Sequence, residues 1–258
     1  MTASAEELLE VARRAAAQVV EPLIDARFTT ELAVETKTSA TDLVTAMDRW
    51  IEATLVDVLT SERPDDGIVG EEGANVASRS GVEWVIDPID GTTNFVRDLP
   101  GYSISIAARA EGEELAALVV DPIRNEWFEA TLGGGAFCNG QRLSVSAPSR
   151  LAQAIVATGF SYQPEVRAEQ AALLTAVLPE VADIRRFGGA ALDCCAVAAG
   201  RVDAYYEREL KDWDIAAGAL IVREAGGITV DLRADNGPFV AASPEVVDAL
   251  LTILGRSR

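Results

Sequence analysis

The chain has 258 residues, 49% of them hydrophobic and 24% charged, which is typical of a globular protein with a sizeable core. Its formal net charge of −19 opposes binding to a nucleic-acid backbone or to an anionic membrane. It contains no histidine, which excludes histidine-ligated zinc, Ser-His-Asp triads and histidine general bases.

The N-terminal segment predicts a helix rather than a signal peptide. Apolar residues from Leu8 to Val20 recur at helical spacing, and acidic residues come before Arg13 and Arg14, as the helix dipole favours. A signal peptide would show basic residues before an unbroken apolar run. No apolar run reaches the ~20 residues of a membrane span, and three cysteines, two of them adjacent, do not form a disulfide framework. We therefore expect a cytoplasmic protein without a membrane segment.

The first half of the chain predicts an α+β arrangement. A second helix is expected over residues 41–59, where Leu43, Met47, Ile51 and Leu55 form an apolar face before ERPDDG ends it. Strands are expected at GIVG and at WVI. The stretches YSISIAARA, ELAALVVDP and NEWFEAT then predict an antiparallel meander, which the turn-rich GGGAFCNG follows.

The second half predicts alternating strands and helices. AIVATG, DIRRF, VDAYYE, GITVDL and PFVAAS have the composition of strands, and the segments between them have that of helices. Such alternation is typical of layered α/β structure. We therefore predict an α/β fold with two subdomains, residues 1–148 and residues 149–258.

Two carboxylates lie three residues apart in WVIDPIDGTTNF, at Asp87 and Asp90. Pro88 has no N–H, so the WVI strand is expected to end there. Two carboxylates at one strand end would raise each other's pKa, and a divalent cation would remove that conflict. With the carbonyl of Ile89 they form an oxygen donor set that suits Mg²⁺. The plain alternative is a turn whose aspartates cap backbone N–H groups.

The residues after Asp90 predict a phosphate site. Gly91, Thr92 and Thr93 open a helical turn, and backbone N–H groups at a helix start attract anions, more closely where glycine has no side chain. One segment thus offers a cation site beside an anion site.

Three further acidic positions extend this pattern. Glu71 and Glu72 end a short strand in a glycine-flanked turn, Asp214 begins a helix of small residues, and Asp48 lies within the predicted second helix. Each has a plain alternative: a solvated loop, a helix N-cap and an exposed helix face, respectively.

Taken together, DPIDGTTNF, GEEG and WDIAAGALIVREAGG, in this order, resemble the inositol monophosphatase family of Mg²⁺-dependent, lithium-sensitive phosphatases. The stretches DLVTAMD and AYYE fit as well, and the resemblance covers essentially the whole chain. It implies a layered αβαβα sandwich, a homodimer, and hydrolysis of a small phosphate monoester. With no histidine, we expect a metal-activated water and no covalent intermediate.

The resemblance implies two or three Mg²⁺ ions per site. Glu71, Asp87 and the Ile89 carbonyl would hold one, and Asp87, Asp90 and Asp214 a second. A third, weaker site would lie near Glu71.

The resemblance also assigns roles beside the metals. Gly91 and Thr92 would bind phosphate through backbone N–H groups. Thr92, paired with Asp48 and beside Glu71, would orient the attacking water. Lys37 matches a lysine that the family carries in the loop before the predicted second helix, which contains Asp48.

For the substrate, Glu207 matches the family's acceptor for a sugar hydroxyl, and Asp90 can face a hydroxyl too. Ser161, Gly188 and Ala190 match the pocket wall. Relatives acting on histidinol phosphate or 3′-phosphoadenosine 5′-phosphate often carry lysine at the position of Thr93, so this sequence favours inositol 1-phosphate. Those two esters and fructose 1,6-bisphosphate stay open as alternatives.

Two rival interpretations remain. Cys195 and Arg201 have the Cys-x5-Arg spacing of cysteine phosphatases, but the residues between them continue an alanine-rich helix that Gly200 ends. The other rival is a non-catalytic Mg²⁺- or partner-binding module. Loss of an acidic ligand would indicate it, and none is lost.

Overall fold

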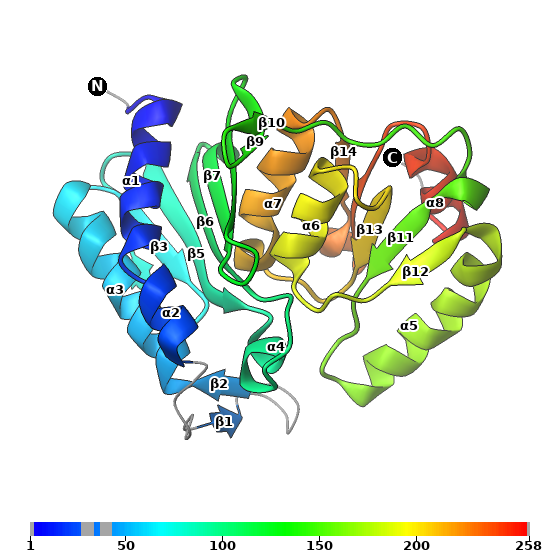
Figure 1. Ribbon diagram of the computed structural model, residues 1–258, viewed down its shortest axis with the longest axis horizontal. Helices are drawn as coiled ribbons and strands as arrows, with labels where there is room; N and C mark the ends of the chain where they lie inside the picture. The colour runs from blue at the N-terminus through cyan, green and yellow to red at the C-terminus, as the bar shows by residue number, and fades with distance from the viewer. Residues whose placement is uncertain (1–2, 27–33, 37–42, 257–258) are drawn as a thin grey trace.

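The computed structural model describes residues 3–26, 34–36 and 43–256, and it shows alternating layers of helices and sheets (Figure 1). Helices α1 and α3 cover one face of a large sheet, and α6 and α7 lie between that sheet and a smaller one. Helices α5 and α8 cover the outer face of the small sheet. The layered αβαβα sandwich expected from the sequence is confirmed.

The helices are α1 (Ala5–Ala17), α2 (Val20–Ala26), α3 (Ala46–Glu62), α4 (Thr92–Val96), α5 (Pro164–Val177), α6 (Ala190–Ala198), α7 (Asp212–Glu224) and α8 (Val247–Ile253), with 3₁₀ turns η1 (Leu151–Gln153), η2 (Leu178–Glu180) and η3 (Arg233–Asp235). The strands are β1 (Val34–Thr36), β2 (Leu43–Thr45), β3 (Gly67–Gly70), β4 (Asn75–Val76), β5 (Val82–Asp90), β6 (Ser103–Ala110), β7 (Glu113–Asp121), β8 (Glu126–Thr131), β9 (Gly135–Cys138), β10 (Gln141–Arg142), β11 (Ile155–Thr158), β12 (Asp183–Arg185), β13 (Ala204–Glu207), β14 (Ile228–Asp231) and β15 (Phe239–Ala242).

The large sheet has the strand order β10-β9-β8-β7-β6-β5-β3-β4, and the meander predicted from the sequence forms its centre. All its pairs are antiparallel except β3 with β5. The small sheet has the order β12-β11-β13-β15-β14, in which β11 pairs in parallel with both neighbours. Strands β1 and β2 form a separate antiparallel pair.

Among the described residues, three apolar cores join these layers. One lies between α1, α3 and the large sheet, with Trp84 and Ile51 fully buried in it. The second lies between the two sheets around α6 and α7, and includes Cys194 and Cys195. The third joins the small sheet to α8. Because α6 and α7 lie between both sheets, residues far apart in sequence meet there.

The strand expected to end at Pro88 continues to Asp90, so that prediction was wrong. Asp87 pairs with Ser105 of β6 and Asp90 pairs with Ser103, so three steps along β5 match two along β6. The extra residue makes a β-bulge, which is where a strand tolerates proline. The pairing with β3 has already ended at Ile86.

The second helix begins later than expected. Residues 43–45 form strand β2, and helix α3 runs from Ala46 to Glu62. Thr45 has extended backbone angles, and its hydroxyl oxygen accepts hydrogen bonds from the N–H groups of Met47 (3.1 Å) and Asp48 (3.4 Å). Thr45 is therefore the helix N-cap, and the apolar periodicity alone did not reveal that the helix begins here.

No helix among the described residues is both long and apolar enough to cross a membrane. The predicted subdomain boundary at residues 148 and 149 falls between β10 and β11. The division into two subdomains stays a prediction.

Candidate active site

Asp87 and Asp90 lie on either side of the β5 bulge, and both are nearly buried, at 2% and 7% exposure. A carboxylate oxygen of Asp87 accepts a hydrogen bond from the N–H of Ile89 at 3.0 Å. The two oxygens of Asp90 accept from the N–H groups of Ala190 (3.1 Å) and Ala191 (2.8 Å) at the start of α6. Asp90 thus joins the large sheet to a helix one hundred residues later in the chain.

Glu71 and Asp214 approach this bulge from two other elements. Glu71 follows β3, and its N–H donates to the carbonyl of Ile86, the residue before Asp87, at 3.3 Å. Asp214 is the third residue of α7, and its carboxylate accepts from the N–H of Lys211 at 2.6 Å. The N-cap alternative for Asp214 is nearly right. The N-cap residue is Lys211, and Asp214 lies inside the helix and accepts a hydrogen bond from the N–H of Lys211.

The four site carboxylates, Glu71, Asp87, Asp90 and Asp214, interact electrostatically. Burial, followed by the charges of Glu71, Asp90 and Asp214, raises the pKa of Asp87 well above its ordinary value. Burial likewise raises the pKa of Asp90 to about 6, and burial together with neighbouring carboxylates raises the pKa of Asp214. Buried like charges of this kind favour a cation between them.

Carboxylate and carbonyl oxygens, as this site offers, are the donors that Mg²⁺ prefers. Within residues 3–26, 34–36 and 43–256, no three acidic, cysteine or histidine side chains are grouped closely enough to hold a metal ion as they stand. Asp87, Asp90 and Asp214 each accept a hydrogen bond from a backbone N–H, and Asp87 is also hydrogen-bonded to the side chain of Glu71.

Thr92 and Asp48 meet as the resemblance implied. Thr92 Oγ1 lies 3.1 Å from Asp48 Oδ1 and 3.0 Å from the carbonyl oxygen of Ile89, and it can donate to either. Asp48 also accepts from the N–H and the hydroxyl of Thr45, at 2.7 and 2.5 Å. Asp48 is 0% exposed, so the exposed-face alternative for it was wrong.

Gly91 must be glycine at this place. Its φ of +87° lies in the left-handed region, and a Cβ atom here would lie 2.6 Å from the carbonyl oxygen of Gly101. The chain therefore turns sharply from β5 into the first turn of α4, beside Asp90.

A pocket of about 130 Å³ brings together the residues predicted to bind substrate. Its wall includes Asp90, Gly91, Ser161, Gly188, Ala190, Glu207 and Asp214. Sequence analysis did not single out Phe160, Tyr162, Arg186, Arg208, Glu209 or Leu210, which also line it. Phe160, Tyr162 and Arg208 are immediate neighbours of Ser161 or Glu207, so extending those two motifs would have found these three.

Glu207 ends strand β13 at this pocket. Burial raises its pKa to about 7, and the hydroxyl of Tyr205 donates to its Oε2 at 2.8 Å. Asp193 in α6 is a further buried carboxylate, 1% exposed, and burial and then Glu207 raise its pKa. No motif had marked Asp193, because its burial depends on how α6 packs.

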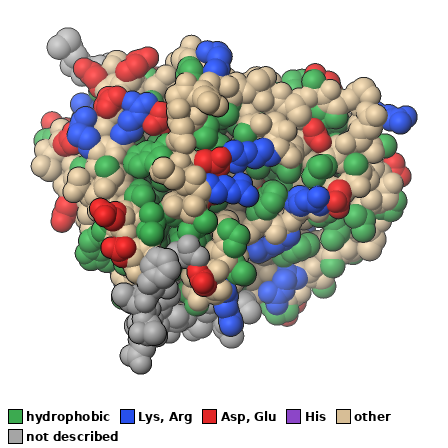
Figure 2. Space-filling model, viewed as in Figure 1, with side chains coloured by type: hydrophobic (Ala, Val, Ile, Leu, Met, Phe, Trp, Pro, Cys, Tyr) green, Lys and Arg blue, Asp and Glu red, His purple; other side chains and the backbone are tan. Residues whose placement is uncertain are grey.

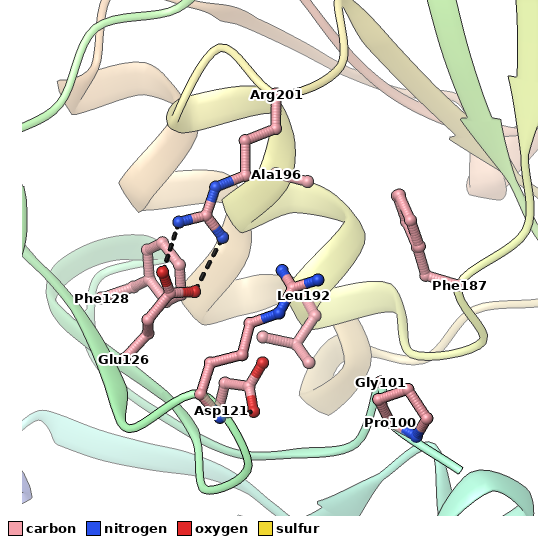
Figure 3. A pocket seen from close by; sticks show the side chains of 10 residues that line it. Pro100, Gly101, Asp121, Glu126, Phe128, Phe187, Leu192, Ala196 and Arg201 are labelled. Carbon is pink, nitrogen blue, oxygen red and sulfur yellow. Dashed lines mark hydrogen bonds and ion pairs between the residues drawn. The ribbon is translucent and has the colours of Figure 1, made fainter.

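A second, larger pocket of about 220 Å³ has none of the four site carboxylates in its lining (Figure 3). We call it the apolar pocket; its lining includes Pro100, Phe128, Phe187, Leu192 and Arg201. Arg201 forms a two-contact ion pair with Glu126 at 2.5 and 2.7 Å, drawn as dashed lines. Lysine and arginine side chains also lie beside acidic ones over the middle of the face in Figure 2.

This arrangement contradicts a cysteine phosphatase. Cys195 is 1% exposed inside α6, and burial raises the pKa of its thiol, which opposes the thiolate that a nucleophile needs. Arg201 is committed to Glu126.

Two residues require separate comment. Lys37 lies outside the described residues. Glu52, which sequence analysis overlooked, is 6% exposed and accepts hydrogen bonds from the N–H groups of Glu72 and Ala74 in the turn that carries Glu71. Its four-residue spacing from Asp48, which places both on one face of a helix, was the available signal.

Comparisons with known proteins found relatives over almost the whole chain. A model of the inositol monophosphatase family matches residues 4–253. The chain is 46% identical to an inositol-1-monophosphatase of Mycobacterium leprae, over 87% of this chain and 82% of that protein. It is also 46% identical to a Nus factor SuhB of Pasteurella multocida, over 83% and 82% of the two chains. The crystal structure of the extragenic suppressor protein SuhB from Bartonella henselae superposes with a TM-score of 0.91 at 36% identity, covering 96% of this chain and 98% of that one.

Proposed function

The chain belongs to the inositol monophosphatase family, and on that basis we propose that it hydrolyses inositol 1-phosphate to myo-inositol and phosphate. The main support for this proposal is the pocket that Asp90, Asp214 and Glu207 line together with Gly91. A polar pocket with acidic groups at one end suits a small polyhydroxylated phosphate ester bound together with cations.

Members of this family are in general Mg²⁺-dependent. We propose that Glu71, Asp87 and the Ile89 carbonyl hold one Mg²⁺ and that Asp87, Asp90 and Asp214 hold a second, with a third, weaker site near Glu71. Bound Mg²⁺ supplies positive charge for the phosphate and lowers the pKa of a water molecule. This local positive charge reconciles an anionic substrate with a protein of net charge −19.

Thr92 orients the attacking water in this proposal. When its hydroxyl donates to Asp48, 3.1 Å away, its oxygen keeps lone pairs that accept a hydrogen bond from water. Asp48 is buried and held by Thr45, so the acceptor cannot turn away. Glu71 lies beside this water, and the backbone N–H groups of Gly91 and Thr92 bind the phosphate.

Glu207 receives a sugar hydroxyl. Tyr205 occupies one of its oxygens, and the other is left to accept from the substrate. Asp90 faces a second hydroxyl, and Ser161, Gly188 and Ala190 form the wall, where small side chains leave room for a ring. Fructose 1,6-bisphosphate, histidinol phosphate and 3′-phosphoadenosine 5′-phosphate are the alternative substrates. We also propose lithium sensitivity, a homodimer and a cytoplasmic location.

The test is phosphate release from these four esters, measured with Mg²⁺ and with EDTA. We expect Mg²⁺-dependent release, fastest from inositol 1-phosphate. A different best substrate would reassign the branch, and release that survives EDTA would overturn the metal proposal.

The second candidate function is a non-catalytic binding module, favoured by the name Nus factor carried by a relative with 46% identity. Against it, every acidic position that the family resemblance requires is present. A folded protein that releases phosphate from none of the four esters would favour this candidate.

A further inference from the structure

We propose that Glu52 is a positioning residue that fixes the turn carrying Glu71, and so sets where Glu71 lies relative to Asp87. This inference rests on the proposed function, because Glu71 and Asp87 are its proposed metal ligands. Glu52 itself is given no contact with metal or substrate.

Both carboxylate oxygens of Glu52 accept hydrogen bonds from the turn between β3 and β4. Its Oε2 accepts from the N–H of Glu72 at 2.7 Å, and its Oε1 accepts from the N–H of Ala74 at 2.9 Å. The two donors lie on either side of Gly73, and Glu72 directly follows Glu71. These partners are backbone groups rather than a cation, so the carboxylate organises the chain instead of neutralising a side chain.

The turn packs tightly against this carboxylate. A Cβ atom on Gly70 would lie 2.3 Å from Glu52 Oε2, so only glycine permits the approach. The N–H of Gly70 also donates to the carbonyl of Ala74 at 2.8 Å, which closes the turn. Glu71 lies inside this closed turn, and its N–H reaches Ile86, next to Asp87.

One face of helix α3 therefore holds two proposed site residues, Thr92 and Glu71, in place. Asp48 receives the hydroxyl of Thr92, and Glu52, one helical turn later, holds the turn of Glu71. Residues four apart on a helix lie on the same side. The helix is rigidly packed, since Ile51 and Leu55 are 0% exposed.

The chain contains a matched control at Glu224, the last residue of α7. Its Oε1 and Oε2 accept from the N–H groups of Gly133 (2.8 Å) and Gly135 (2.7 Å), in the turn that leads from β8 into β9. The chemistry is the same as at Glu52, but that turn carries no proposed site residue.

The experiment compares Glu52→Gln, Glu52→Asp and Glu224→Gln in the full chain. Mn²⁺ binding is measured from the electron paramagnetic resonance signal of the free ion. We expect Glu52→Gln to weaken Mn²⁺ binding about tenfold or more, as loss of a supporting partner does at metal sites. Glu52→Asp keeps the charge but shortens the reach, and we expect an intermediate loss. Glu224→Gln should stay within about twofold of wild type, because it leaves the ligands untouched.

Activity gives a second reading of the same effect. The Mg²⁺ concentration for half-maximal turnover should rise in the order wild type, Glu52→Asp, Glu52→Gln. The KM for the ester at saturating Mg²⁺ should change little. If Glu52→Asp binds Mn²⁺ as wild type does, Glu52 acts through charge alone and the positioning role is overturned.

Amide hydrogen exchange separates this inference from the proposed function. Exchange over residues 70–76 should quicken in both Glu52 variants, with or without metal. Glutamine keeps only one acceptor oxygen for the N–H groups of Glu72 and Ala74, and aspartate holds its two oxygens farther from them. If wild type binds no Mn²⁺, the proposed function fails, and exchange still decides whether Glu52 fixes the turn. Unchanged exchange would overturn the inference by itself.

Discussion

Carboxylates in two regions of this molecule experience opposite environments. At the apolar pocket, Glu126 pairs with Arg201, whose hydrogen bonds lower the pKa of that carboxyl (Figure 3). At the bulge of β5, burial and like charges raise the pKa of Asp87 and Asp90 instead. Glu126 is thus compensated by an arginine of the same chain. Asp87 and Asp90 accept hydrogen bonds from backbone N–H groups instead, and in the proposed function cations from solution supply the compensating charge.

The two pockets also show that the larger volume does not coincide with the cluster of buried carboxylates. The larger pocket has mostly apolar walls and contains the Arg201–Glu126 ion pair, whereas the smaller one contains Asp90, Glu207 and Asp214. Perturbed pKa values together with a specific set of neighbours locate function better than volume does.

The substitution Asp87→Asn should break this contrast most strongly. We expect Mg²⁺-dependent turnover to fall by about a hundredfold or more, since one proposed ligand shared by two ions is lost. The melting temperature in metal-free buffer should rise, because a buried uncompensated charge is removed. Phosphate release and thermal unfolding with and without Mg²⁺ measure both. Full turnover together with a lower melting temperature would show that Asp87 is structural.

Asp48→Asn should have the next largest effect. The amide can still accept from one partner but loses the second acceptor oxygen, so Thr92 is held less firmly. We expect kcat to fall about ten- to a hundredfold while the Mg²⁺ concentration for half-maximal activity changes little. Steady-state kinetics over a Mg²⁺ series provide the test. A shift mainly in Mg²⁺ requirement would place Asp48 among the metal ligands instead.

The pH dependence of stability sharpens the contrast further. The folded-state pKa of Glu207 is raised to about 7, above its ordinary 4.5. The folded protein therefore binds protons more tightly than the unfolded chain between about pH 4 and 7, and the free energy of unfolding falls as pH rises across that window. Metal-free Glu207→Gln should lose a few degrees less in melting temperature than wild type between about pH 5 and 8. Parallel profiles for the two proteins would contradict the raised pKa.

The smallest effect is expected at the apolar pocket. Arg201→Gln removes a partly exposed ion pair, which contributes about 1 kcal/mol or less. Turnover and Mg²⁺ requirement should stay as in wild type, because Arg201 lies outside the pocket of Asp90 and Glu207. A large loss of activity would mean that the two pockets communicate.

Local patterns anticipated much of this molecule. Residue spacing predicts the strands of the meander, the alternating second half and the order of the acidic motifs. Hydrophobic periodicity and turn residues act over a few neighbouring positions, so they can be recognised in the sequence. The bulge at Pro88 could not be anticipated, because it depends on where β3 stops pairing and β6 continues.

The sequence by itself thus determined the family and the kinds of elements, and it marked the acidic residues that we propose carry the chemistry. Only the tertiary structure decided that Asp48 and Glu52 are buried, that Asp90 bonds the start of α6, and that Glu207 lines the same pocket as Asp90. Burial and contacts across one hundred residues depend on the order in which strands and helices pack. Short-range patterns carry no information about that order.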